Sequence, residues 1–435
     1  MMKIRQSLSQ VAMLVCLCAA GFPLYGQPSA ALNTARLLSE ARGPVRIVCF
    51  GDSITGTYYH SGNRRAWPEM LKVALARLYP KADVEVLNAG VSGNTSAQGL
   101  ARLQKDVLAR KPHLVIVMFG MNDLAYGAAT PEQDAARKAG FAGNLKAMTE
   151  ACRTVGAEVL LCTQNPVYPD AVPLRPPERV GEFAGLIRQT GAALKVPVAD
   201  IYTEWEALRK TEERSWRLLM SETIHPSMAG HKRMAERVAA TLAGRPISLA
   251  DVRAEQPVCG GLIARLTEGK PVTLDVPAPL AAGARAMVLR RFPSADVAVV
   301  SAPEKAASLK ARADGYQGVR NRKPDLVFVS LAPDELDVGD EESYVRQVSW
   351  MVNWALPFDG AAWTAVGVDP ALLGRGLTPK QREGAELLRE IVRGHDLDWI
   401  GPTSGASVKL QDALDHWFDA QVGKNRTAHQ KGEGT

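Results

Sequence analysis

Four short polar segments, far apart in the 435-residue sequence, contain side chains whose types could do chemistry together. Each of the first three follows a run of apolar residues, and the fourth precedes an amphipathic run. The segments are Gly51-Asp52-Ser53, residues 88–96 (NAGVSGNTS), residues 120–123 (GMND) and residues 221–231 (SETIHPSMAGH). A hydroxyl, an imidazole, an amide and flexible glycines are the groups that acyl transfer requires.

Ser53 and His225 are the pair that could carry a covalent reaction. A serine hydroxyl is a poor nucleophile unless a base removes its proton, and an imidazole can accept that proton and later return it to a leaving alcohol. The tetrahedral intermediate that follows such an attack carries an oxyanion, which preorganised hydrogen-bond donors stabilise. A plain turn serine is the alternative interpretation, so the hypothesis depends on the other segments lying close to Ser53.

The apolar runs before these segments indicate strands that are buried on both faces. They lack the alternation of a half-exposed strand, and amphipathic helical runs separate them, which predicts a parallel sheet between two helical layers. The expected strands are 45–50, 84–88, 114–119, 158–162 and 196–200, and the expected helices include 67–79, 96–111, 141–155 and 227–244. Ligands of such sheets gather at the carboxyl ends of the strands, where the first three segments would meet.

With these four segments in this order, the sequence resembles the SGNH (GDSL) hydrolases, a family named after the Ser, Gly, Asn and His of four such blocks. The resemblance covers about residues 45–244, and the G-x-S-x-G elbow of the α/β-hydrolase fold is absent from the sequence. It implies a flavodoxin-like, three-layer α/β/α fold with Ser53 as nucleophile and His225 as base. It also implies an oxyanion hole made by the backbone N–H groups of Ser53 and Gly93 and the side-chain amide of Asn122.

The sequence departs from the family pattern at the third catalytic position. The family usually has Asp three residues before the histidine, and this chain has Glu222 there. A carboxylate at that position can still orient the Nδ1–H group of His225, although the glutamate arm is one methylene longer. The backbone carbonyl of Ser221 or the side chain of Asp200 could orient the ring instead, and family members are known to work as dyads.

Residues 55–67 (TGTYYHSGNRRAW) follow the serine and could line the mouth of the site. Aromatic faces stack on sugar rings and arginines bind acidic groups, so the segment suggests a substrate-binding loop. A surface loop whose aromatic residues pack inwards is the alternative. The candidate substrate-binding residues are Asp52, Tyr58, Tyr59, His60, Arg64 and Trp67, of which Asp52 is also expected to accept N–H bonds in its own turn.

The second half of the sequence looks like a degenerate copy of the first. The matching pairs are residues 75–90 with 288–303, an offset of 213, and residues 110–124 with 322–336, an offset of 212. Two matches at nearly one offset predict a second, smaller α/β domain. Because Asp334 stands where Asn122 would be and Gly401 where the histidine would be, we expect this domain to be catalytically inactive.

The sequence thus divides into five parts. They are a signal peptide (1–26), a catalytic SGNH-type domain (42–244), a linker (245–267), a degenerate SGNH-like α/β domain (268–422) and a disordered tail (423–435). In the signal peptide, Lys3 and Arg5 precede an apolar run of about a dozen residues, too short to span a bilayer comfortably. The protein is therefore expected in the periplasm or outside the cell, without a stable membrane span after cleavage; an uncleaved anchor is the alternative.

Charge and cysteine content exclude several classes of function. Net charge is +6, and +4 once Lys3 and Arg5 are removed, which gives nucleic-acid binding little support. Four cysteines remain after cleavage, Cys49, Cys152, Cys162 and Cys259, and we expect them to be buried free thiols. The sequence suggests no metal site and no cofactor.

Together these observations predict an exported serine esterase that acts through a Ser-His-Glu acyl-enzyme mechanism. An exported enzyme with an aromatic and basic mouth loop favours acyl esters, chiefly acetyl esters, of carbohydrate. The expected partner is a small-molecule or polysaccharide ester, and the sequence predicts no oligomeric state. Alternatives are a lipid or lysophospholipid esterase, a non-catalytic carbohydrate-binding protein with the same fold, and an acyltransferase.

Overall fold

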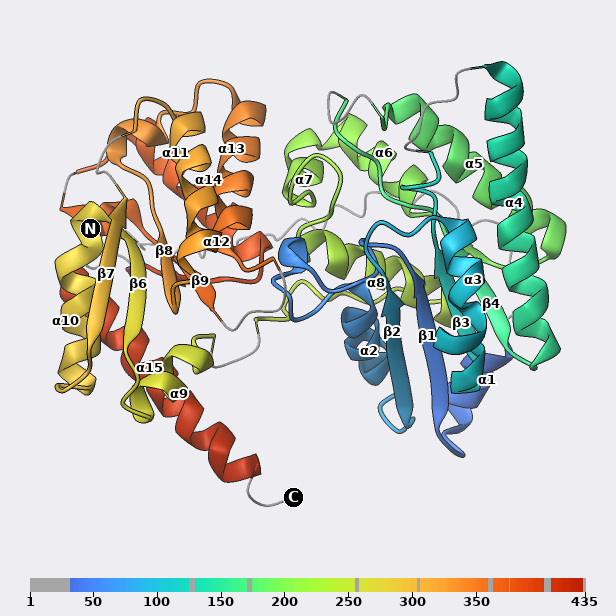
Figure 1. The fold of residues 1–435 in the computed structure, drawn as a ribbon, viewed down its shortest axis with the longest axis horizontal. Helices are drawn as coiled ribbons and strands as arrows, with labels where there is room; N and C mark the ends of the chain where they lie inside the picture. The colour runs from blue at the N-terminus through green and yellow to red at the C-terminus, as the bar shows by residue number, and fades with distance from the viewer. Residues whose placement is uncertain are drawn as a thin grey trace, which may run out of the picture.

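The computed structural model describes residues 32–124, 130–169, 174–254, 258–302, 306–358, 363–374, 376–402 and 408–432. In these residues the chain forms two α/β domains that lie side by side (Figure 1). Each domain is built around one parallel, five-stranded sheet, which confirms the predicted fold class. The predicted signal peptide lies outside the described residues.

The first sheet has the strand order β2-β1-β3-β4-β5. Its strands are β1 (Val45–Gly51), β2 (Val84–Gly90), β3 (Leu114–Met118), β4 (Glu158–Cys162) and β5 (Val198–Ala199). The helices are α1 (Asn33–Glu40), α2 (Trp67–Leu78), α3 (Ser96–Asp106), α4 (Pro131–Thr154), α5 (Pro177–Leu194), α6 (Ile201–Thr211), α7 (Glu213–Leu218) and α8 (Met228–Ala243). Helices α1 and α2 pack against α8, whereas α3, α4 and α5 pack in sequence as a second layer.

The fifth strand is shorter than its apolar run predicts. Pro197 has no N–H to donate, so β5 begins only at Val198. Asp200 ends it, because its side chain accepts the backbone N–H of Thr203 at 3.2 Å and caps α6. The two residues that remain still pair with the end of β4.

The second sheet repeats the order and the register of the first. Its order is β10-β9-β8-β6-β7, with strands β6 (Val272–Pro277), β7 (Val297–Ala302), β8 (Leu326–Val329), β9 (Thr364–Val368) and β10 (Asp398–Ile400). Counted by position in each sheet, both orders are 2-1-3-4-5, the doubly wound order. The matched residues Val84 and Val297 face Val45 and Val272, the first residues of β1 and β6. The structure therefore supports the repeat that the sequence predicts.

The remaining helices cover the second sheet and extend the second domain at both ends. They are α9 (Gly260–Thr267), α10 (Ala281–Arg291), α11 (Leu309–Gly315), α12 (Val319–Arg322), α13 (Glu341–Ala355), α14 (Pro379–Gly394) and α15 (Leu410–Gly432). Helix α9 lies in the predicted linker and buries Leu262 and Ile263 in the second core. Helix α15 buries Phe418 and Val422 in the same core and continues to Gly432, past residue 423, where the predicted tail begins.

The first domain also begins earlier than predicted. Helix α1 starts at Asn33, ahead of the expected boundary at residue 42, and buries Leu38 in the first core. The carboxylate of Glu158, at the start of β4, accepts the backbone N–H groups of Asn33 and Thr34, each at 2.7 Å. These two backbone N–H groups lie in the first turn of α1, where they have no acceptor within the helix.

Two properties of the described residues bear on the predicted location and chemistry. All four cysteines, Cys49, Cys152, Cys162 and Cys259, are buried free thiols, as expected, and burial raises the pKa of each. No helix within the described ranges has both the length and the apolar character needed to cross a bilayer.

Candidate active site

Ser53 is presented by a tight turn at the carboxyl end of β1. A Cβ atom at Gly51 would lie 2.5 Å from the carbonyl oxygen of Met118 on β3, so only glycine allows the strands to approach here. The Asp52 carboxylate accepts the backbone N–H of Ile54 at 2.9 Å, which closes the turn as an Asx motif. Burial raises the pKa of Asp52 to about 7. Asp52 thus shapes the turn, and Ser53 remains at its tip.

His225 links Ser53 to Glu222 in one hydrogen-bonded chain. The Ser53 Oγ and His225 Nε2 atoms are 2.9 Å apart, and His225 Nδ1 bonds to a carboxylate oxygen of Glu222. That carboxylate also accepts the backbone N–H groups of His225 (2.8 Å) and Ile224 (3.1 Å) and the Thr223 hydroxyl (2.9 Å). Burial alone would raise the pKa of Glu222, but the adjacent His225 and these hydrogen bonds bring it below its usual value. Glu222 is therefore an ionised, well-ordered partner of the ring.

Neither of the other groups considered for orienting His225 is available to it. The Asp200 side chain caps α6 and accepts the Thr163 hydroxyl at 3.1 Å. The carbonyl oxygen of Ser221 accepts the side-chain amide of Asn353 at 2.6 Å. The extra methylene of Glu222 is accommodated because its carboxylate folds back on its own turn.

The expected oxyanion-hole residues come together beside this chain. The Asn122 side-chain N–H donates to the Asn94 carbonyl at 3.1 Å and lies 3.5 Å from the Asp52 carboxylate. Arg175 donates to the Asn122 side-chain oxygen at 3.0 Å, which leaves the NH₂ group directed to the side of Asp52 and Asn94. Gly93, next to Asn94, is exposed with φ at +75°, a conformation that favours glycine. The loops after β1, β2 and β3 are thus in contact around Ser53.

Asn122→Ala is expected to lower kcat by about 10²- to 10³-fold, because loss of one preorganised oxyanion donor costs roughly 3–4 kcal/mol of barrier. KM should change little, since the donor acts mainly on the charge that develops after attack. Steady-state hydrolysis of p-nitrophenyl acetate measures both constants. Asn33→Ala, on α1 at the opposite edge of the sheet, is the control, and equal rates for the two variants would contradict this role of Asn122.

Most of the predicted mouth loop packs inwards, which corrects the expectation that it lines the substrate mouth. The side chains of Asp52, His60 and Trp67 are almost fully buried. The Tyr58 hydroxyl accepts the backbone N–H of Ser92 at 2.8 Å and so ties this segment to the loop after β2. The apolar and aromatic character of the segment reflects core packing, the alternative interpretation of the sequence.

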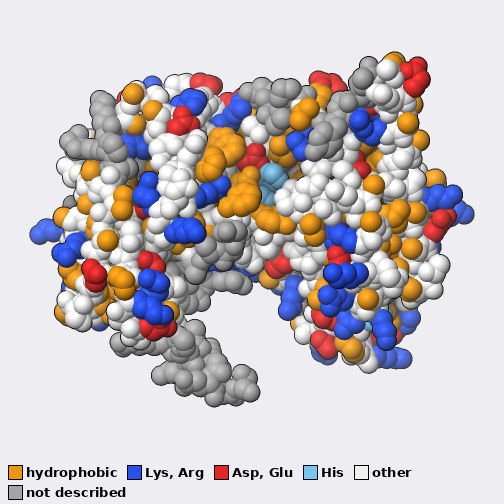
Figure 2. All heavy atoms as spheres, in the orientation of Figure 1, with side chains coloured by type: hydrophobic (Ala, Val, Ile, Leu, Met, Phe, Trp, Pro, Cys, Tyr) orange, Lys and Arg blue, Asp and Glu red, His pale blue; other side chains and the backbone are white. Residues whose placement is uncertain are grey.

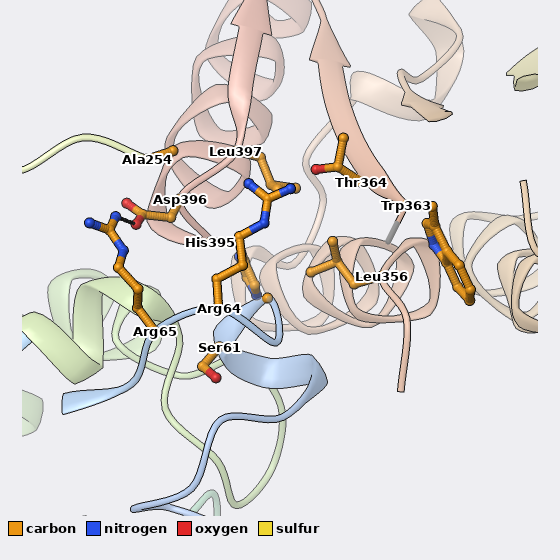
Figure 3. A pocket seen from close by; sticks show the side chains of 11 residues that line it. Ser61, Arg64, Arg65, Ala254, Leu356, Trp363, Thr364, His395, Asp396 and Leu397 are labelled. Carbon is orange, nitrogen blue, oxygen red and sulfur yellow. Dashed lines mark hydrogen bonds and ion pairs between the residues drawn. The ribbon is translucent and has the colours of Figure 1, made fainter. Parts of the chain in front are cut away.

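The remaining two candidate residues of this loop, Arg64 and Tyr59, lie in two different places. Arg64 donates to the Val258 carbonyl at 2.9 Å and lines a small cavity between the domains (Figure 3). That cavity has a volume of about 20 Å³, room for roughly one water molecule and not for a substrate. Tyr59 is half-buried and lies beside His225, since its ring meets the His225 ring edge-on with centroids 6.1 Å apart.

Two buried histidines, His60 and His231, support the ring of His225. His60 stacks on His225 with centroids 4.4 Å apart and planes 13° from parallel. His60 Nδ1 lies 3.2 Å from His231 Nε2, and His231 Nδ1 accepts the backbone N–H of Trp67 at 3.2 Å. Burial lowers the pKa of His60 well below its usual value and that of His231 to about 3, so both rings are neutral. His225 therefore rests on an uncharged aromatic surface.

The second domain also contacts the loop that carries His225. Asn353 of α13 donates to the Ser221 carbonyl at 2.6 Å and accepts the Ser221 hydroxyl at 2.7 Å, and both residues are buried. The Ser221 N–H donates in turn to the His225 carbonyl at 2.9 Å. The sequence contains no signal for this contact, because the partners are 132 residues apart and belong to different domains.

Asn353→Ala is expected to lower kcat about ten- to hundredfold, because small displacements of catalytic groups have effects of that size. The substitution leaves the buried carbonyl and hydroxyl of Ser221 unpaired. Gln421→Ala is the matched control: it removes a buried amide that accepts the Val258 N–H at 3.0 Å within the second domain, away from His225. If thermal stability and kcat fall alike in both variants, Asn353 has only a structural role.

The first domain is similar in sequence to known esterases. The model of the GDSL-like lipase/acylhydrolase family matches residues 49–233. Esterase TesA of Pseudomonas aeruginosa is 30% identical over 207 residues, which cover 47% of this chain and 92% of TesA. An acetylxylan esterase of Geobacillus stearothermophilus is 26% identical, covering 37% of this chain and 73% of that protein. The uncharacterized lipoprotein YqeF of Bacillus subtilis is 33% identical, but the match spans only about half (51%) of it and 29% of this chain.

The crystal structure of a lipase/acylhydrolase from Enterococcus faecalis is 29% identical, with a TM-score of 0.40, covering 47% of this chain and 97% of that one. The family match and the similar esterases show that the protein is a carboxylic ester hydrolase. The chain belongs to the GDSL-like lipase/acylhydrolase family. The family match ends at residue 233, so the second domain lies outside it.

Proposed function

We propose that this protein is an exported serine esterase that removes acyl groups, chiefly acetyl, from carbohydrate esters. One observation carries the proposal: Ser53 Oγ lies 2.9 Å from His225 Nε2, while His225 Nδ1 is bonded to the ionised Glu222 carboxylate. This arrangement leaves Nε2 free to accept a proton from Ser53, as general-base activation requires. It also argues against a non-catalytic binding protein, which needs no such chain.

The proposed reaction has two half-reactions on the same residues. Ser53 Oγ attacks the ester carbonyl as its proton moves to His225 Nε2, and the amide of Asn122 with backbone N–H groups of Ser53 and Gly93 stabilises the oxyanion. His225 then returns the proton to the leaving alcohol, which departs and leaves Ser53 acylated. Water, deprotonated by His225, attacks the acyl-enzyme and releases the acid. Glu222 balances the positive charge that His225 carries between these steps.

Three observations support the finer parts of the proposal. The acetylxylan esterase from Geobacillus stearothermophilus is similar over most of its own length, which favours acetyl groups on carbohydrate. Export, to the periplasm or outside the cell, is supported by residues 1–26, with Lys3 and Arg5 before an apolar run, and by similarity to a lipoprotein. The second domain is proposed to be inactive, because β6 ends at Pro277 and leads directly into a 3-10 helix (Ala278–Leu280), whereas β1 leads into the nucleophile turn.

Acetate release from a panel of substrates tests this function. The panel contains acetylated xylan, acetylated xylo-oligosaccharides, p-nitrophenyl acetate and a lysophospholipid, each with the wild-type protein and with Ser53→Ala. We expect Ser53-dependent release that is fastest from the acetylated carbohydrates. Faster release of fatty acid from the lysophospholipid would overturn the carbohydrate assignment, and absence of any Ser53-dependent release would overturn the esterase mechanism.

A further inference from the structure

An aromatic cluster joins the two domains beside the catalytic histidine. The Arg320 guanidinium lies over three rings, at 4.9 Å from the Tyr59 centroid, 4.3 Å from Trp354 and 5.4 Å from Phe358. Tyr59 belongs to the first domain, and the other three residues belong to the second. Tyr59 and Phe358 also stack on each other, with centroids 5.5 Å apart and planes 18° from parallel.

This cluster is firmly held in place. Arg320 donates to the carbonyl oxygens of Leu356 (3.1 Å) and Asn353 (2.8 Å), which fixes the end of α13 and the chain that leads to Phe358. From the first domain, the Asn63 side chain donates to the carbonyl oxygen of Pro357. Two of the Arg320 nitrogens are therefore committed to backbone, and the Phe358 ring sits on a preorganised support.

Phe358 is also exposed, which is unusual for a ring in such a cluster. Among the described residues, four large apolar side chains are exposed: Val91, Val155, Leu174 and Phe358, with Phe358 the most exposed at 55%. Val91 lies in the loop of Gly93, and Leu174 directly precedes the arginine that holds Asn122. Three of the four thus lie in or next to segments that contact the site, where exposed apolar groups can take part in ligand binding. Figure 2 shows hydrophobic and histidine side chains gathered at the seam between the domains.

We propose that Phe358, supported by Tyr59, is a binding ledge for a sugar ring in the alcohol part of the ester substrate. The inference rests on the proposed function and adds that the catalytically inactive domain takes part in substrate selection. The apolar C–H face of a pyranose can pack flat on an exposed aromatic ring, whereas an acyl chain would require an enclosed apolar channel. Because Tyr59 contacts both Phe358 and His225, a ring on the ledge lies next to the scissile bond.

The test compares esters with and without a ring in Phe358→Ala, Phe358→Trp and Val155→Ala. Val155 is a matched control, since it is 49% exposed but precedes β4 at the opposite edge of the sheet. The measurement is kcat/KM for an acetylated xylo-oligosaccharide and for ethyl acetate. In Phe358→Ala the ratio of these two values is expected to fall about three- to tenfold, mainly through KM of the sugar ester, as loss of one aromatic stacking contact implies. Phe358→Trp should restore the ratio, and Val155→Ala should keep the wild-type ratio.

The outcomes separate this inference from the esterase assignment. An unchanged ratio in Phe358→Ala, or equal losses on both esters, overturns the ledge while the esterase stands. If the wild-type protein hydrolyses ethyl acetate but not the sugar ester, the sugar-ring assignment is likewise overturned. If it hydrolyses neither, the proposed function fails, and calorimetric titration of wild type and Phe358→Ala with unacetylated xylo-oligosaccharide decides the ledge: weaker binding to the variant supports it, and equal or absent binding overturns it.

Discussion

Ser53→Ala is expected to lower kcat/KM for acetyl esters by about 10⁴- to 10⁶-fold, the range seen when the nucleophile of a serine hydrolase is removed. The hydroxyl stands 2.9 Å from Nε2 of His225, the base proposed to activate it, and alanine leaves His225 with nothing to deprotonate but water. The oxyanion donors and the substrate contacts remain, so residual activity above the uncatalysed rate should persist. Binding of product or substrate should change little, because the change removes a single oxygen atom.

The experiment requires a control for folding and a direct sign of the intermediate. Ser39→Ala, at an exposed position on α1, should keep wild-type activity and the same thermal transition. Rapid mixing of the wild-type protein with p-nitrophenyl acetate should give a burst of p-nitrophenol, provided that deacylation is slower than acylation, and mass spectrometry of the quenched protein should place the acetyl group on Ser53. Activity of Ser53→Ala within tenfold of wild type would exclude Ser53 as the nucleophile.

The sequence predicted the parts of this structure that depend on local pattern. Buried β-branched runs define β1 and β3, and the glycine turn after β1 presents Ser53 because no other residue fits between the strands. The spacing of three residues between Glu222 and His225 lets one turn carry both members of this hydrogen-bonded pair. The repeat was also predictable, since the matched Val84 and Val297 occupy one register position in the two sheets.

The sequence could not predict features that arise when the two domains pack together. The same aromatic residues suit a substrate loop and a buried segment, and only packing shows that His60 and Trp67 are inside while Tyr59 reaches the site. Asn353 and Phe358 lie in the second domain, whereas Ser53, His225 and Glu222 lie in the first, and no pattern within the second domain points to His225. The groups proposed to react therefore come from the first domain, whereas contacts from the second domain help to hold them in place. For this reason, variants in the second domain should alter turnover and substrate choice without abolishing the reaction.

Glu222→Gln is expected to lower kcat by about 10³- to 10⁴-fold, comparable with the loss seen when the triad carboxylate of other serine hydrolases becomes an amide. The wild-type carboxylate accepts the Nδ1–H group of His225, which keeps the proton off Nε2, the atom that must accept the Ser53 proton. An amide can turn its NH₂ group towards Nδ1 and favour the opposite tautomer. It also removes the negative charge that stabilises the imidazolium in each half-reaction.

Glu222→Asp keeps the charge and so separates electrostatics from geometry. The four hydrogen bonds that the Glu222 carboxylate accepts from its own turn and from the ring depend on the full length of its arm, so aspartate should lose some of them. We expect a loss of about ten- to hundredfold, smaller than for glutamine, because one misplaced catalytic contact has effects of this size. Kinetics of both variants with p-nitrophenyl acetate, and crystal structures that show the position of the ring, provide the measurement. Wild-type turnover in Glu222→Gln would mean that Ser53 and His225 work as a dyad, whereas a greater loss in Glu222→Asp than in Glu222→Gln would mean that the carboxylate serves mainly to shape the turn.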